Sequence, residues 1–262
     1  MDEKFVTIKR NKIRYLEDGK SNQNLILLHG LGGYAERWSN LIPFLAKKFH
    51  LFVPDMIGYG QSDKPTADYT PEYFAKFVFD WMDTVGIKNT SMIGTSLGGQ
   101  VVIECAATQS PTIKKIILIS PAGIMRKPTP VLEAYTMAAL YPTKEAVKNA
   151  YQMMVGQGKQ VSEISIERFV NNMSRPNAKM VFLSTLLGLK NAPDISEKLK
   201  SINIPSLIIW GEEDKLIPFE YAQHFVSLIN GCKFMSMKGC GHSPYIEDPE
   251  KLSQLAIKFL AE

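Results

Sequence analysis

The sequence predicts an α/β fold in which a mainly parallel sheet is flanked by helices and interrupted by a helical insertion. Three observations support this prediction. Apolar, strand-like runs alternate with segments of helical spacing over most of the 262 residues, which is typical of a parallel sheet covered on both faces. Between residues 122 and 201 the strand runs disappear and helical patterns dominate. Around Ser96, a strand-like run turns directly into a helical one.

Most of the strands are predicted in the N-terminal part of the chain. Residues 5–9 and 12–16 alternate in polarity around Arg10-Asn11, which indicates a β-hairpin. A further strand is indicated by the nearly continuous apolar run at 24–30, which is typical of burial on both faces. Other strand-like runs lie at 50–55, 90–94 and 113–120. Helical spacing fills the gaps between these runs, over 38–49, over 71–85 behind the N-cap residue Thr70, and from Gly98 onward.

Residues 122–201 are expected to form a helical cap over the carboxyl ends of the strands. The helical patterns of this insertion cover 131–141, 144–155, 162–173 and 179–189. The strand rhythm resumes at 204–211 and 233–237, with a helix between them and another after Asp248. The predicted core domain therefore comprises residues 1–121 and 202–262. Six of the twelve methionines lie in the cap, where methionine can line an adaptable apolar pocket or, for most of them, fill the core between helices.

Composition and charge exclude several classes of function. The net charge is +4 without a dense basic stripe, so nucleic-acid binding is not expected. The N-terminus lacks an apolar signal core, and no apolar run approaches the roughly 18 residues that a membrane span needs. The three cysteines form no C-x-x-C pair, which favours reduced thiols and a cytoplasmic location. The sequence does not indicate an oligomeric state.

The turn around Ser96 has the pattern G-x-S-x-G, with Gly94 and Gly98 on either side. A residue at such a strand-to-helix turn is expected to have a strained backbone with positive φ, and side chains two positions away would collide with the turn. The helix that follows directs free N–H groups and a partial positive charge toward the serine. This arrangement suits a nucleophile that generates an oxyanion, although the pattern alone is weak evidence.

A nucleophilic serine needs a histidine base that a carboxylate orients. His242 is the preferred base because it lies in a glycine-flanked loop after the last predicted strand, whereas the remaining histidines look structural or solvent-facing, namely His29, His50 and His224. Asp214 is the preferred acid, since it lies closer to the apex of its loop than Glu212 or Glu213. The chain order serine, aspartate, histidine then agrees with this assignment.

Five motifs in this order resemble an α/β-hydrolase-fold serine hydrolase over nearly the whole chain; they span residues 29–33, 55–62, 94–99, 211–214 and 241–244. The resemblance implies an eight-stranded sheet, Ser96 as nucleophile, Asp214 as orienting acid and His242 as base. It also implies an oxyanion hole formed by the backbone N–H groups of Leu31 and Leu97. The loop 55–62 resembles a structural loop of the family, without a catalytic role. No metal or organic cofactor is expected.

Departures from related families narrow the predicted reaction. Relatives that cleave halides or epoxides have an aspartate where this chain has Ser96. Relatives that cleave carbon–carbon bonds in ring-fission products typically have asparagine and tryptophan where Thr95 and Ser243 stand. The predicted function is therefore hydrolysis of a small-molecule carboxylic ester with an apolar acyl part. The alternatives are a lactonase, a thioesterase or a carbon–carbon bond hydrolase with the same residues and, in a different class, a non-catalytic ligand-binding protein.

Overall fold

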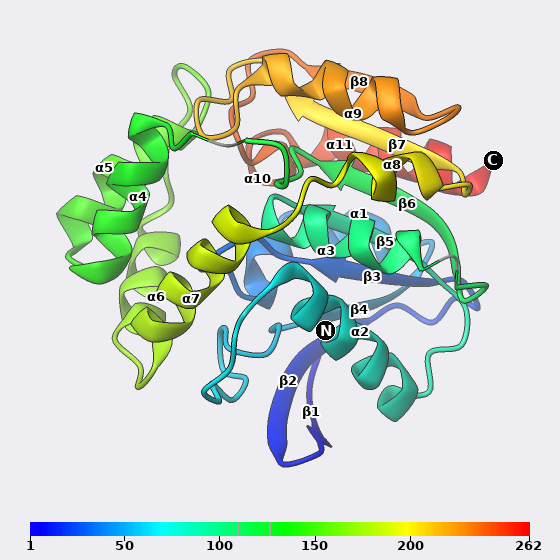
Figure 1. Cartoon of the computed structure of the whole chain (residues 1–262), viewed down its shortest axis with the longest axis horizontal. Helices are drawn as coiled ribbons and strands as arrows, with labels where there is room; N and C mark the ends of the chain where they lie inside the picture. Colours follow the sequence, from blue (N-terminus) through cyan, green and yellow to red (C-terminus); the bar gives the residue numbers. More distant parts are fainter. Residues whose placement is uncertain (109, 126) are drawn as a thin grey trace.

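A twisted sheet of eight strands, in the order β1-β2-β4-β3-β5-β6-β7-β8, forms the centre of the molecule (Figure 1). The computed structural model describes residues 1–108, 110–125 and 127–262. The strands are β1 (Asp2–Ile8), β2 (Asn11–Asp18), β3 (Asn24–Leu28), β4 (His50–Pro54), β5 (Thr90–Thr95), β6 (Ile113–Ile119), β7 (Ser206–Gly211) and β8 (Lys233–Met237). Pairings from β4 through β3 to β8 are parallel, while β2 is antiparallel to β1 and to β4. The predicted mainly parallel, eight-stranded sheet is confirmed.

The hairpin β1–β2 turns one residue earlier than predicted. Ile8 pairs with Asn11, so the connection consists of Lys9 and Arg10 instead of Arg10-Asn11. Lys9 has a φ of 57°, in the left-handed region that tight hairpin turns require. A lysine is not a typical signal for this conformation, which explains the one-residue error.

Helices cover both faces of the sheet and create two separate apolar layers. One face packs against α2 (Pro71–Val85), α3 (Leu97–Ala107) and α9 (Ala222–Leu228), and the other against the short α1 (Ile42–Leu45) and α11 (Pro249–Ala261). Side chains in β6 alternate between the layers, Ile116 and Leu118 toward the first and Ile117 toward the second. This alternation explains why buried parallel strands have continuous apolar sequences.

The first predicted helix, over residues 38–49, was wrong in extent. The structure replaces it with the 3₁₀ turn η1 (Ala35–Trp38) and the four-residue α1. Pro43 lies in the first turn of α1, as expected, because a proline farther inside a helix would remove a hydrogen bond and clash with the preceding turn. Two short pieces therefore bury Trp38 and Leu45 where the apolar spacing suggested one helix.

The helical insertion between β6 and β7 is confirmed. It contains α4 (Pro130–Leu140), α5 (Lys144–Met154), α6 (Glu163–Met173) and α7 (Ala178–Asn191), which lie together at one end of the sheet, on the left in Figure 1. Thr129 and Thr143 cap α4 and α5 by accepting hydrogen bonds from the N–H groups of Leu132 and Ala146.

The limits of the cap at residues 122 and 201 stay a prediction. The last helix within these limits, α8 (Ser196–Ser201), packs against α3 and α9 of the core. In the part of the chain that the structure describes, no helix is long and apolar enough to cross a membrane.

Candidate active site

Ser96 occupies the strained turn between β5 and α3 that the sequence predicted. Its φ and ψ are 54° and −120°, outside the regions that residues with a β-carbon ordinarily adopt. A β-carbon at Gly94 would lie 2.3 Å from the carbonyl oxygen of Gly98, and one at Gly98 would lie 2.2 Å from that of Leu28. Glycine is therefore required at both positions, and the turn presents the Ser96 side chain at the carboxyl end of the sheet.

His242 and Asp214 meet in a buried hydrogen bond, although 28 residues separate them along the chain. The distance between His242 Nδ1 and Asp214 Oδ2 is 2.7 Å. The other oxygen of Asp214 accepts the backbone N–H groups of Leu216 and Ile217, each at 2.9 Å. An ionised carboxylate only accepts hydrogen bonds, so the proton of the neutral imidazole belongs on Nδ1, which leaves Nε2 as an acceptor.

The loop that carries His242 is fixed by contacts with the cap and with a short helix. The backbone N–H of His242 donates to the carbonyl of Met154 at 2.8 Å. The carboxylate of Glu247, in α10 (Pro244–Glu247), accepts N–H groups of Gly156 at 2.8 Å, Gly241 at 2.9 Å and Ser243 at 3.0 Å. This carboxylate therefore joins the histidine loop to the segment that follows α5 in the cap.

Glu247 was missed by the sequence analysis. The available signal was Pro244, because a proline followed by an acidic residue within one turn is typical of a helix start. The predicted C-terminal helix after Asp248 is confirmed as α11, which Asp248 caps by accepting the N–H of Lys251, but this helix does not include Glu247. Nothing in the sequence pattern indicated that the Glu247 carboxylate would turn back toward the histidine loop.

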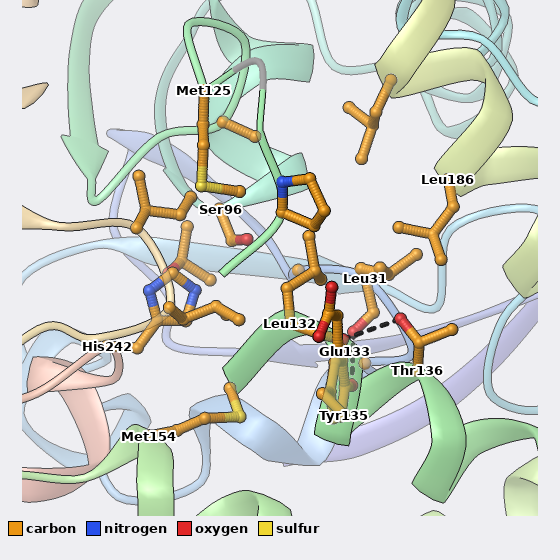
Figure 2. Close-up of a pocket in the computed structure, with 18 of the residues that line it drawn as sticks. Leu31, Ser96, Met125, Leu132, Glu133, Tyr135, Thr136, Met154, Leu186 and His242 are labelled. Atoms are coloured by element: carbon orange, nitrogen blue, oxygen red, sulfur yellow. Dashed lines mark hydrogen bonds between the residues drawn. The ribbon is translucent and has the colours of Figure 1, made fainter. Parts of the chain in front are cut away.

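Ser96 and His242 line one cavity of about 670 Å³ between the core and the cap. Figure 2 shows both side chains in the wall of this cavity, with Leu132 and Tyr135 from α4, Leu186 from α7, and the methionines Met125 and Met154. Most of the lining side chains are apolar. No hydrogen bond joins Ser96 to His242 among the described residues; such contacts often tighten only when substrate binds.

The loop after β3 lies directly beside Ser96. A β-carbon at Gly30 would lie 3.1 Å from Cβ and 3.7 Å from Oγ of Ser96, which explains the glycine there. Leu31 also lines the cavity, and Leu97 is the first residue of α3, so its N–H has no carbonyl partner within the helix. The structure thus brings the segments of both predicted oxyanion donors to the turn that carries Ser96.

The cap holds this loop through Tyr135. Its hydroxyl donates to the carbonyl of Leu31 at 2.7 Å (dashed in Figure 2). The same hydroxyl would lie 2.6 Å from a β-carbon at Gly32, and the ring packs against Phe169 and Phe182 of the cap. Burial raises the pKa of Tyr135 well above its usual value, so the hydroxyl keeps the proton that it donates.

His29 supports the loop without lining the cavity. Its Nε2 accepts the backbone N–H of Met56 at 3.1 Å, and its Nδ1 donates to the carbonyl of Gly30 at 2.8 Å. Complete burial lowers the pKa of this imidazole, and only the neutral form can make both contacts. The neighbouring Asp55 accepts N–H groups of Ala35 and Gln61 and pairs with the Arg14 guanidinium.

Several other polar or ionisable side chains do not line the cavity. Tyr141, Arg168 and Arg175 are exposed and do not line it, whereas Tyr135 does. Cys240 is a buried free thiol whose pKa is raised by burial to about 11, so it is protonated and unreactive at neutral pH. Across the described residues, no cluster of three or more histidine, cysteine, aspartate or glutamate side chains could hold a metal ion.

Comparisons with known proteins agree with this geometry. Residues 23–145 match the family model for the alpha/beta hydrolase fold. The chain is 26% identical to the 2-hydroxy-6-oxo-6-(2'-aminophenyl)hexa-2,4-dienoic acid hydrolase of Metapseudomonas resinovorans, covering 99% of this chain and 91% of that protein. It is 28% identical to Lipase 3 of a Moraxella species, over 90% of this chain and 77% of the lipase.

Solved structures of hydrolases also resemble this chain. The crystal structure of a serine hydrolase involved in carbazole degradation, the CarC enzyme, superimposes with a TM-score of 0.88 at 25% identity and covers 99% of this chain and 98% of its own. The topology and these comparisons together show that the chain has the α/β-hydrolase fold and is similar over nearly its whole length to serine hydrolases with this fold.

Proposed function

We propose that this serine hydrolase cleaves carboxylic esters through an acyl-enzyme formed on Ser96, with His242 as general base and acid and Asp214 as the residue that orients it. The observation that carries the proposal is the hydrogen bond of 2.7 Å between His242 and Asp214, in the wall of the cavity that Ser96 also lines. This arrangement leaves an imidazole nitrogen free to accept the serine proton, which is the activation that a hydroxyl nucleophile needs.

In the proposed mechanism, Ser96 Oγ attacks the ester carbonyl while His242 Nε2 takes its proton. The tetrahedral oxyanion is held by the backbone N–H groups of Leu31 and Leu97, and donors fixed in advance stabilise such a charge strongly. His242 then protonates the leaving alcohol, and the acyl group remains on Ser96. Water, deprotonated by the same imidazole, attacks the acyl-enzyme, and the collapse of the second intermediate releases the acid and the free serine.

The cavity supports a small-molecule substrate with an apolar acyl part. Its volume of about 670 Å³ is of the size that small-ligand sites have. Leucine and methionine side chains from the cap cover much of its wall, including Leu132, Leu186, Met125 and Met154. A cytoplasmic location belongs to the same proposal and is supported by the three free cysteines.

Carbon–carbon bond cleavage is the second candidate, because the relatives favour it. Besides the Metapseudomonas enzyme, the 2-hydroxy-6-oxo-6-phenylhexa-2,4-dienoate hydrolase of Burkholderia cepacia is 27% identical over 98% of this chain. The lining residues Thr95 and Ser243 favour ester hydrolysis over carbon–carbon bond cleavage, because hydrolases of the second kind typically have asparagine and tryptophan at these positions. A lactone or thioester would meet the same nucleophile.

One substrate panel separates these reactions. 4-Nitrophenyl esters of graded chain length, lactones, thioesters and 2-hydroxy-6-oxo-6-phenylhexa-2,4-dienoate are compared by kcat/KM, alongside fluorophosphonate labelling of Ser96. Stoichiometric labelling with the highest kcat/KM on an ester supports the proposal. A higher kcat/KM on the dienoate would replace it with carbon–carbon hydrolysis. Absence of labelling would exclude an activated Ser96 and favour a non-catalytic ligand-binding protein.

A further inference from the structure

Arg37 places a positive charge in the wall of the active-site cavity. It lies in η1 (Ala35–Trp38), directly after the loop that contains Leu31, and its side chain is partly buried. The guanidinium lies 5.1 Å from the ring centroid of Tyr151 on α5. An arginine side chain remains charged at all physiological pH values, so this part of the cavity is cationic.

Arg37 has no anionic partner among the described residues. The carboxylate of its neighbour Glu36 is paired with Arg14, whose two terminal guanidinium nitrogens donate to it at 2.7 and 3.1 Å. The one carboxylate in the described lining of the cavity, Glu133, is exposed and makes no ion pair with Arg37. The groups that interact electrostatically with the guanidinium are tyrosines, Tyr34, Tyr135, Tyr151 and Tyr245, of which Tyr151 lies against it. Burial raises the pKa values of Tyr34, Tyr135 and Tyr151, so these rings supply no negative charge.

Among the described residues, two other cations removed from solvent are paired with carboxylates, and the partly buried Lys64 donates to the carbonyls of Gly60 and Ser62 instead, whereas Arg37 has neither kind of partner. Arg14 is buried and contacts three carboxylates, those of Glu3, Glu36 and Asp55. Lys198 bridges Glu72 and Glu104 at 2.7 and 2.6 Å. Withdrawing a charge from water without a partner is costly, so a cation left unpaired inside a ligand cavity indicates that a ligand supplies the missing anion.

The charges elsewhere in the cavity wall also favour an anion. Two lysines, Lys127 and Lys190, line the cavity and are exposed. Together with Arg37 they give three cations against the single carboxylate of Glu133 among the described residues of the lining. Exposed lysines are screened by salt over about 10 Å, so they attract an anion without fixing its position. The partly buried Arg37 can bind it directly, because a guanidinium matches the two oxygens of a carboxylate.

We propose that Arg37 forms a carboxylate subsite in this cavity, so that the substrate is a small ester that carries a carboxylate at a distance from the scissile bond. The inference rests on the proposed ester hydrolysis and extends it to a substrate class. The apolar walls accommodate the hydrocarbon part, Ser96 meets the ester carbonyl, and Arg37 holds the charged end. No covalent step involves Arg37; it selects and positions the substrate.

Charged and neutral esters of matched shape test the proposal. One pair compares the 4-nitrophenyl monoester of adipic acid with its neutral amide analogue, and the other compares 4-butanoyloxybenzoate with 4-butanoyloxybenzamide. Arg37→Gln should lower kcat/KM for the anionic member of at least one pair by about tenfold to a hundredfold, as expected for the loss of a charge-assisted hydrogen bond. The neutral members should change by less than about threefold, and Arg37→Lys should retain part of the preference.

The controls separate charge recognition from folding. Lys238→Gln removes an equal charge from an exposed position outside the cavity and should leave every rate within about twofold, since exposed charges are strongly screened. Unchanged hydrolysis of the neutral esters shows that Arg37→Gln is folded. If Arg37→Gln lowers kcat/KM equally for both members of each pair of esters, or lowers it for none of them, the carboxylate subsite is excluded.

A binding assay keeps this test independent of ester hydrolysis. Adipate should slow fluorophosphonate labelling of Ser96 in the wild-type protein, adipamide should not, and Arg37→Gln should abolish the difference. If no ester is hydrolysed but adipate still protects Ser96 through Arg37, the proposed reaction fails while the carboxylate subsite stands. If adipate and adipamide act alike on the wild-type protein, the subsite is excluded whatever the reaction.

Discussion

The turn that carries Ser96 and the cap that covers it are built in different ways. At the turn, backbone atoms approach so closely that a β-carbon at Gly94 or Gly98 would lie within 2.3 Å of a carbonyl oxygen. In the cap, helices meet through side chains such as Phe169 and Phe182, and packed side chains of similar volume can replace one another at small cost. The turn therefore fixes the position of the Ser96 side chain, while the cap can vary the shape of the cavity.

The largest effect is expected from removing the proposed nucleophile. Ser96→Ala should lower kcat by about 10⁴- to 10⁶-fold, and Asp214→Asn by about 10⁴-fold, because the groups of such a triad act as a unit. Both variants should keep the thermal stability of the wild-type protein to within a few degrees. Steady-state kinetics on the best ester measure kcat, and thermal unfolding followed by circular dichroism is the folding control. A loss below tenfold for Ser96→Ala on that ester would contradict the assignment.

The close backbone contacts of the turn predict the next largest effect. Gly98→Ala should reduce the free energy of unfolding by about 2–4 kcal/mol, since overpacking is costly and no flexible side chain can move aside. Gly86→Ala is the matched control: Gly86 has a φ of 86° but no atom within 4 Å of an added β-carbon, so only the left-handed backbone penalty of about 1–2 kcal/mol applies. Urea denaturation compares the two, and equal losses would show that the contacts at Gly98 relax.

The difference between the backbone contacts of the turn and the side-chain contacts of the cap explains how much could be predicted from the sequence. The sheet, the helical insertion and the positions of Ser96, Asp214 and His242 at strand ends follow from local patterns, because glycine spacing and buried strands have few alternatives. The segments that carry Leu31 and Leu97 were located for the same reason. The catalytic roles of these residues stay predictions until they are tested by substitution.

Contacts made by single side chains across long distances could not be predicted. Tyr135 contacts a loop 104 residues away, and Glu247 contacts Gly156 from 91 residues away. Whether a side chain reaches such a partner depends on how the cap packs on the core, and no local pattern encodes that. Arg37 was overlooked for a related reason, since the absence of a partner is visible only after all neighbouring carboxylates are placed.

The hydrogen bond of Tyr135 connects the cap to the loop beside the Ser96 turn, and the removal of one oxygen atom breaks it. Tyr135→Phe removes the hydrogen bond to the Leu31 carbonyl and should lower kcat about three- to tenfold, in line with one neutral hydrogen bond, with KM changed by less than about twofold. Binding of a boronic acid that mimics the tetrahedral intermediate should weaken similarly. Tyr141→Phe, on the exposed end of the cap, is the control and should change neither. An effect on KM alone would show that Tyr135 binds substrate without positioning Leu31.

The smallest effect concerns the pH dependence of stability at His29. Burial lowers the pKa of this imidazole, so the unfolded state binds a proton at higher pH than the folded state does. Its contribution to stability is therefore present above about pH 6.5, the ordinary value for histidine, and is lost as the pH falls through the folded pKa. The slope from this one group is at most about 1.4 kcal/mol per pH unit.

Unfolding free energies measured from pH 5 to 8 should fall more steeply on the acid side for the wild-type protein than for His29→Gln. His224→Gln, which removes an exposed imidazole, should follow the wild-type curve. Parallel curves for wild-type and His29→Gln would contradict the prediction, because they would mean that the folded and unfolded states bind the His29 proton equally well.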